Sequence, residues 1–173
     1  MATDIPIENT NVNTAPQVQL DQTQRLLAGS VLDLFAGRPS LKKLSLWTDD
    51  ATFEDPLTKA GGRKQYEAQW YGLQTAFSEI ERLNHQVTSS GNPIEMDLSQ
   101  RYKVKGIGME KTINSKVKIF YNNAGKITRV EDRWDGELPD SSIQNVFRSL
   151  NAVTVPKMVG VPKNDAEDAK KGN

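Results

Sequence analysis

The sequence predicts an α+β fold, with helices on one face of a curved antiparallel sheet. In the first half of the 173-residue chain, apolar residues recur at helical spacing. Between residues 79 and 134 they alternate instead with polar residues, which is typical of half-buried strands. One more helical pattern follows the last of these strands. Helices segregated from a run of hairpin strands indicate the α+β class.

Both ends of the chain have compositions typical of disordered tails. Residues 1–19 are rich in Asn, Thr and Gln and contain Pro6 and Pro16, so they offer little to bury. Residues 163–173 are charged and lack large apolar side chains. We therefore expect disordered tails at 1–19 and 163–173 around one domain at 20–162, which is long enough to close a core without disulfides or metals.

Two helices are predicted first. One begins near Asp21, because Gln24 three residues later completes a capping box. Gly37 and Pro39 are stop signals that end it. A second, short helix begins at Ser40, and its apolar residues are Leu41, Leu44 and Trp47.

A short strand and a third helix follow. The strand spans residues 51–56, because Pro56 lacks the N–H group that a continuing central strand needs. Gly61 and Gly62 precede the helix. Its apolar stripe, spaced i, i+4, i+7 and i+11, consists of Tyr66, Trp70, Leu73 and Phe77.

The period-two region predicts hairpin strands and then a terminal helix. Strand patterns begin near residue 79 and continue at 96–104, 116–121 and 127–134, with turns at 89–93 and 122–125. Ser141 can cap the last helix, since Gln144 stands three residues on. Prolines and a glycine break the apolar stretch 153–161, so we expect it to pack along a surface groove. If residues 152–162 instead close the mouth of the fold, they would act as a lid.

Three segments in this order resemble SnoaL-like domains of the nuclear-transport-factor-two-like (NTF2-like) superfamily. Residues 46–56, LWTDDATFEDP, resemble a helix end followed by a D-D-A-x-F-x-D-P strand. Residues 61–66 resemble the Gly-rich entry to the third helix, and residues 126–135 resemble the final strand. The resemblance covers residues 21–150. It implies a cystatin-like, cone-shaped barrel whose bent sheet wraps around the long helix, and homodimers through the outer face of the sheet.

The resemblance does not imply one activity. Ketosteroid isomerases, scytalone dehydratases, epoxide hydrolases, polyketide cyclases and non-catalytic binding proteins share this fold, so the site must be argued separately. The sequence matches no single catalytic signature of these enzymes. Two hypotheses remain. One is a cofactor-free isomerase, dehydratase or cyclase that binds a small hydrophobic molecule in its cone, and the other is a non-catalytic binding or dimerisation scaffold.

Three residues are candidates for acid–base chemistry, each with a structural alternative. Asp132 shares strand parity with Trp134, and a carboxylate held beside an indole and away from water would have a raised pKa; the alternatives are a register error or an ion pair with Arg101 or Arg129. His85, the only histidine, has inward parity with Val87, although it could be a structural hydrogen-bonding residue. Asp55 lies where the resemblance places a ketosteroid isomerase base, but an Asp before Pro is also a common turn residue.

Five aromatic residues are predicted to line the pocket and to stack on a flat ligand: Tyr66, Trp70, Phe77, Tyr102 and Trp134. An aromatic stripe on a helix is also the usual composition of a core. A cavity that contains both His85 and Asp132 would favour an enzyme, whereas an interior filled by Trp70, Phe77 and Trp134 would favour a scaffold.

Composition excludes several other classes of function. The chain has no cysteine, one histidine and equal numbers of acidic and basic residues. We therefore expect no metal site, no cofactor and no nucleic-acid partner. The N-terminus lacks a signal-peptide pattern, and no apolar run is long enough to span a membrane. We expect a cytoplasmic protein without a membrane partner.

Overall fold

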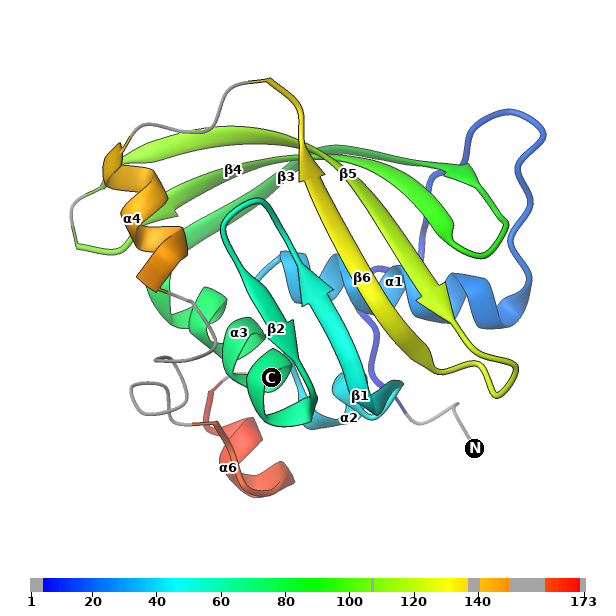
Figure 1. Ribbon diagram of the computed structural model, residues 1–173, viewed down its shortest axis with the longest axis horizontal. Coiled ribbons are helices and arrows are strands. Elements are labelled where there is room, and N and C mark those ends of the chain that lie inside the picture. Colours follow the sequence, from blue (N-terminus) through cyan, green and yellow to red (C-terminus); the bar gives the residue numbers. More distant parts are fainter. Residues whose placement is uncertain (1–4, 107, 137–140, 150–160, 172–173) are drawn as a thin grey trace.

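A computed structural model describes residues 5–106, 108–136, 141–149 and 161–171. In it a six-stranded sheet curves around the helices (Figure 1). The helices are α1 (Gln22–Phe35), α2 (Leu41–Leu44), α3 (Arg63–Ala76), α4 (Ser141–Ser149) and α6 (Asp165–Ala169). The strands are β1 (Trp47–Glu54), β2 (Lys59–Gly61), β3 (Phe77–Ser89), β4 (Ile94–Val104), β5 (Glu110–Tyr121) and β6 (Ile127–Trp134). The predicted α+β class and curved sheet are confirmed.

The sheet is mixed rather than wholly antiparallel. Its strand order is β2-β1-β6-β5-β4-β3, and β1 runs parallel to β6, while every other neighbouring pair is antiparallel. A parallel pair needs a long crossover, and here that crossover consists of β2, α3 and the strands β3 to β5. Sequence periodicity reports which face of a strand is buried but not which strand lies beside it, so the parallel pair was not predicted.

The core lies between α1, α3 and the concave face of the sheet. Helix α3 contacts β1 and β2 at one edge of the sheet and β3 at the other edge, so the sheet wraps around this helix. The capping box at Asp21 and Gln24 is present as predicted, because Gln24 N donates to Asp21 Oδ1 at 2.7 Å and Asp21 N donates to Gln24 Oε1 at 2.9 Å. Gly37 follows α1 with a φ of +76°, a left-handed conformation that glycine adopts without strain.

Three details of the sequence prediction were wrong. Trp47 begins β1 and does not continue α2. Phe77 begins β3, so the aromatic stripe of α3 ends at Leu73. Leu83 is 47% exposed, although parity placed it inward with His85. The register of β3 against β4 shifts between Arg82 and Asn84, and such a shift reverses the face of the residues on one side of it.

Residues 5–20 pack against the domain, where a disordered tail was expected. Asn13 and Ala15 exchange backbone hydrogen bonds of 2.8 Å with Val87, so the segment covers the free edge of β3. Val12 is buried. The segment is also held by Asp33 on α1, a fully buried carboxylate that accepts from the backbone N–H groups of Glu8 at 2.8 Å and Asn9 at 3.0 Å. Backbone hydrogen bonding, which composition does not report, orders this segment.

The C-terminal segment also packs against the domain, although a disordered tail was expected at residues 163–173. Its helix α6 presents Asp168, a buried carboxylate that accepts from the Tyr71 hydroxyl at 2.6 Å and from Leu41 N at 2.8 Å. These contacts fasten α6 to α2 and α3. Most of the stretch 152–162, for which we considered a groove or a lid, lies outside the described residues. Within the described ranges, no helix is long and apolar enough to cross a membrane.

Candidate functional site

The parallel pairing of β1 with β6 brings Asp55 and Asp132 together. Glu54 lies opposite Glu131 in this register, and neighbouring strands are about 4.8 Å apart. The next residue on each chain segment is the aspartate. Because successive side chains on a strand alternate between its faces, the two glutamates and the two aspartates project to opposite sides. Arg129 pairs with both glutamates, and the aspartates lie together at the end of the cone.

Two hollows share these aspartates. The outer one is an open cleft of about 520 Å³, lined by Glu54, Asp55, Pro56, Lys116, Glu131, Asp132, Arg133, Trp134 and Asp135. The inner one is a cavity of about 20 Å³ inside the cone, lined by Phe35, Phe53, Asp55, Gln69, Trp70, Leu73, Tyr102, Asp132, Trp134 and Phe147. The aspartates therefore lie where the cone interior meets the surface. A space of about 20 Å³ accommodates roughly one water molecule.

Asp132 is the more deeply buried of the two carboxyls, with 6% of its surface exposed. Trp134 Nε1 donates to Asp132 Oδ2 at 3.0 Å, whereas Asp132 Oδ1 has no hydrogen-bond partner among the described residues. Burial raises the pKa of Asp132 to about 7, the indole hydrogen bond and, to a smaller extent, the Ser115 hydroxyl oppose this rise, and the nearby charge of Asp55 adds to it. The carboxyl is thus poised to gain or lose a proton near neutral pH.

Asp55 is held by the turn between β1 and β2. Its Oδ1 accepts from Leu57 N at 2.8 Å, and its backbone N–H donates to Thr58 O at 2.9 Å. This is the turn geometry that an aspartate before proline favours. Burial raises the pKa of Asp55 to about 6, and the hydrogen bonds from Leu57 and Thr58 limit the rise. Asp55 is therefore a turn residue whose carboxyl also lines the cleft.

Polar side chains from other elements complete the inner cavity. The hydroxyl oxygen of Tyr102, on β4, accepts from Gln100 Nε2 at 2.8 Å. Burial raises the pKa of Tyr102 far above its usual value, and the charges of Asp132 and Asp55 raise it further, so the phenol stays protonated. On α3, Gln69 Oε1 and Trp70 Nε1 are buried without a hydrogen-bond partner in the described part of the chain. The cavity therefore offers hydrogen-bonding groups of both kinds.

Aromatic rings fill most of the remaining interior. Phe147, from α4, packs edge-on against Trp134 and Tyr102, with ring centroids 5.1 Å and 5.5 Å away. Trp70 packs against Phe35 and Phe53 at 5.1 Å and 4.8 Å. The sequence predicted the last helix, but which cavity its Phe147 side chain enters depends on how α4 crosses the cone.

The predicted lining residues divide between the cavity and the core. Trp70, Tyr102 and Trp134 line the cavity. Phe77 lies behind its wall, 5.2 Å from Tyr102 between ring centroids. Tyr66 stacks at 4.8 Å on Trp47, and its hydroxyl donates to Thr48 O at 3.1 Å, away from the cavity lining.

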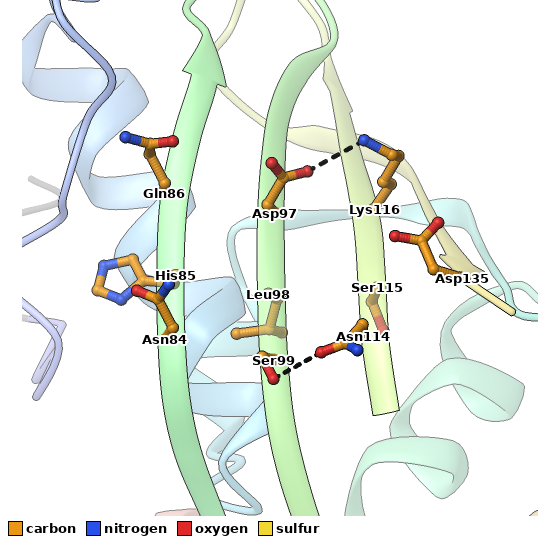
Figure 2. A pocket seen from close by; sticks show the side chains of 10 residues that line it. All are labelled: Asn84, His85, Gln86, Asp97, Leu98, Ser99, Asn114, Ser115, Lys116 and Asp135. Atoms are coloured by element: carbon orange, nitrogen blue, oxygen red, sulfur yellow. Dashed lines mark hydrogen bonds and ion pairs between the residues drawn. The ribbon is translucent and has the colours of Figure 1, made fainter. Parts of the chain in front are cut away.

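His85 lies apart from Asp132. Although His85 is buried, its Nε2 accepts from Asn13 N at 3.1 Å, so it fastens the N-terminal segment to β3. It contributes to a different hollow of about 270 Å³ on β3, β4 and β5, and no hollow described in the structure contains both His85 and Asp132. In Figure 2 its ring points away from β4 and β5, while Asp97–Lys116 and Ser99–Asn114 bridge neighbouring strands. Burial and Arg82 lower the pKa of His85.

Gln69 was missed by the sequence analysis. It lies directly before Trp70 in the helical stripe and is 3% exposed. A polar residue beside the apolar face of a helix is normally read as solvent-facing. The sequence signal that could have found it is the run AQWYGL at residues 68–73, which has no charged residue and only Gln69 as an amide, so the whole turn is expected to be buried.

Comparison with solved structures identifies the fold. The chain is similar to a steroid delta-isomerase from Pseudomonas aeruginosa (TM-score 0.55, 15% identity, covering 78% of this chain and 92% of that one). It is also similar to a putative polyketide cyclase from Silicibacter sp. TM1040 (TM-score 0.56, 11% identity, covering 69% and 93%). A third similar structure is an NTF2-like protein of unknown function from Exiguobacterium sp. 255-15 (TM-score 0.53, 20% identity, covering 64% and 99%).

Neither a protein-family model nor a curated protein matches the chain. The structural similarities show that the chain has an NTF2-like fold, which is the fold that the sequence motifs predicted. At these identities they establish the fold alone, so the function must be argued from the Asp55–Asp132 site.

Proposed function

We propose that this protein binds a small molecule at the Asp55–Asp132 site and transfers a proton to or from it without a cofactor. The observation that carries the proposal is the free Oδ1 atom of Asp132, a buried acceptor without a partner in the described structure, at the junction of cleft and cavity. Buried polar atoms are normally hydrogen-bonded, and an exception suggests a bound group. Ionisable groups with shifted pKa values in a cleft also favour an acid–base site.

Asp55 would act as the base and Asp132 as the acid. With a pKa of about 6, Asp55 is mostly ionised at neutral pH and is suited to accept a proton. Asp132, with a pKa of about 7, retains its proton in a large fraction of molecules and is suited to donate one. The protonated phenol of Tyr102 would stabilise negative charge that develops on a carbonyl oxygen. This set fits isomerisation, dehydration or cyclisation next to a carbonyl.

The sizes of the hollows locate the substrate. The inner cavity, about 20 Å³, accepts a single non-hydrogen group, so the body of the ligand would lie in the cleft of about 520 Å³. One polar substituent would reach past Asp55 and Asp132 toward Tyr102. The proposed ligand is therefore less enclosed than the small apolar molecule inside the cone that the sequence suggested. The isomerase and cyclase among the similar structures are consistent with this kind of chemistry.

Proton exchange tests the proposal directly. A panel of cyclic ketones is incubated with the protein in D2O, and the loss of the hydrogens next to the carbonyl is followed by NMR. We expect exchange above the buffer rate, with Asp132→Asn and Asp55→Asn each slowing it about 100-fold or more. Asp50→Asn is the matched control, because Asp50 is exposed on β1 outside the cleft lining. Equal exchange by all four proteins would rule out the assigned roles.

A non-catalytic scaffold is the second candidate. Trp70, Trp134 and Phe147 nearly fill the cone, as a core without a ligand would require. For such a scaffold we propose a homodimer through the outer face of the sheet, where Lys116–Asp97 at 3.4 Å and Lys118–Glu95 at 3.7 Å are cross-strand ion pairs. Association through this charged face should weaken with salt. Sedimentation equilibrium at low and high salt tests it, and a monomer under both conditions would exclude this dimer.

A further inference from the structure

The cleft at the Asp55–Asp132 site carries an excess of acidic groups. Its lining includes the carboxyls of Glu54, Asp55, Glu131, Asp132 and Asp135 but only two cationic side chains, Lys116 and Arg133. The chain as a whole is neutral, with 22 acidic and 22 basic residues, so this excess is local. A cleft lined mainly by one sign of charge concentrates ligands of the opposite sign.

The ion pairs of the lining leave part of this charge unbalanced. Arg129 pairs with both glutamates, and Lys59 lies 3.5 Å from Glu54. Lys116 pairs with Asp97, outside the cleft. In the described structure Asp55, Asp132 and Asp135 have no ion-pair partner, and Arg133 is the single cation of the lining left to offset them.

Asp132 Oδ1, which has no hydrogen-bond partner in the described structure, indicates where in the cleft a donor group of the ligand would bind. Oδ1 belongs to a side chain that is 94% buried, with 6% exposed, and this side chain lines both hollows. The ionised carboxylate can only accept, so at alkaline pH the missing partner of Oδ1 is an N–H or O–H donor. A charged N–H donor makes a stronger hydrogen bond to a carboxylate than a neutral one does, and it also relieves the burial of a negative charge.

We infer that the ligand is a small amine bound as its ammonium ion, whose N–H group donates to Asp132 Oδ1 while its carbon skeleton lies in the cleft beside Trp134. This inference rests on the proposed function and specifies its substrate class. Asp135 and Asp55 add attraction from the cleft side, and anionic ligands such as carboxylates are repelled. When the amine is bound, Asp132 is ionised and anchors the ammonium instead of donating a proton. Asp55 remains the base, and the phenol of Tyr102 is the donor left to stabilise the carbonyl oxygen.

Calorimetric titration of the full chain at pH 8 tests the inference with probes of one shape and different charge. Cyclohexylamine, cyclohexanol and cyclohexanecarboxylate are titrated into the wild type, Asp132→Asn, Asp135→Asn and the control Asp50→Asn. We expect the amine to bind about tenfold or more tightly than the alcohol, because a hydrogen bond to a charged group is worth more than a neutral one. The carboxylate should not bind. Asp132→Asn should remove the amine preference, and Asp50→Asn should retain it.

If Asp132→Asn fails to fold, the Asp135→Asn variant still tests the inference, because Asp135 is exposed. Asp135→Asn should weaken amine binding severalfold, and added salt should weaken it in the wild type. Equal affinity for alcohol and amine would overturn the inference and leave the proposed acid–base function standing. Ketone exchange without any amine binding would overturn it as well. Amine binding without exchange of any carbonyl probe would instead contradict the proposed reaction, so the two failures are distinguishable.

Discussion

Trp134 Nε1 donates a hydrogen bond of 3.0 Å to Asp132 Oδ2, between side chains two residues apart on β6. Both side chains face the interior because residues at i and i+2 of a strand share a face. The indole stabilises the ionised carboxyl and so opposes the effect of burial on its pKa. This contact makes Asp132 lose its proton more readily than burial alone would allow.

Trp134→Phe should therefore raise the pKa of Asp132 above about 7. The phenyl ring retains apolar contact but lacks the N–H donor, so the ionised form loses a stabilising partner while burial continues to act against it. Carbon-13 NMR of the aspartate carboxyls across pH 4 to 10 measures the change. Trp47→Phe is the control, because the buried Nε1 of Trp47 has no hydrogen-bond partner in the described structure. An Asp132 titration unchanged by Trp134→Phe would show that the indole does not tune this carboxyl.

Asp132→Asn should stabilise the protein at alkaline pH. The pKa of Asp132 is raised to about 7 in the fold, against about 3.9 for an unfolded chain, so the folded state holds this proton more tightly. Stability is then lost as pH rises from about 4 to about 7, in the direction that proton linkage requires. Asn carries no charge, so the variant should avoid a loss on the order of a few kcal/mol.

Urea unfolding of the wild type and Asp132→Asn at pH 5 and pH 8 measures this difference. The variant should gain stability relative to the wild type on going to pH 8. The groups that face Asp132 are Asp55, Tyr102, Trp134 and Ser115, and Asp55, whose pKa is raised to about 6 in the wild type, is present in both proteins. Asp50→Asn, a change at an exposed carboxyl, should follow the wild type at both pH values. Parallel pH curves for wild type and Asp132→Asn would contradict the raised pKa.

Asp33→Asn should be strongly destabilising. Lys43 Nζ lies 3.2 Å from Asp33 Oδ2, and both side chains are at most 4% exposed. Neutralising one partner leaves the lysine as a buried charge, which costs about 3–5 kcal/mol. It also weakens the hydrogen bonds that hold Glu8 and Asn9. Urea unfolding measures the loss, and hydrogen exchange at Asn13 and Ala15 reports whether the N-terminal segment leaves β3. A loss below about 1 kcal/mol would show that this pair is dispensable.

The sequence predicted those features of the fold that depend on local pattern. The Asp21–Gln24 capping box, the turn at Asn122–Gly125 and the alternation of β4 all follow from near neighbours in the chain. Asp132 was found for the same reason, since its parity with Trp134 is local. The packed terminal segments were missed because the contacts of Asp33 and Asp168 join residues far apart in sequence.

Local sequence pattern could not predict that Asp55 and Asp132 lie together in one site. His85 and Asp132 are both buried, but inward parity on two strands does not bring two residues into one cavity. Asp55 joins Asp132 because β1 runs parallel to β6, a pairing made across a crossover that periodicity cannot report. The Asp-Pro pattern indicated a turn, and the turn is present. The long-range register is what turns that residue into part of a candidate acid–base pair.

Phe147→Ala should open the cone to small apolar molecules. The ring of Phe147 is 4% exposed and packs against Phe77, Tyr102 and Trp134 with centroids 5.1–5.5 Å away, so its removal joins new volume to the cavity of about 20 Å³. Apolar cavities of about 150 Å³ bind benzene. Stability should fall by about 3–5 kcal/mol.

Benzene binding to Phe147→Ala, measured by NMR shifts of interior methyl groups, separates an open cavity from a collapsed one. The wild type and Phe120→Ala, which changes a partly exposed ring away from the cavity lining, should not bind it. A folded Phe147→Ala protein that excludes benzene would mean that α4 and the neighbouring rings close over the gap. In that case Phe147 is a packing residue of the core. Binding would instead show that the aromatic interior is a site held closed by one side chain of α4.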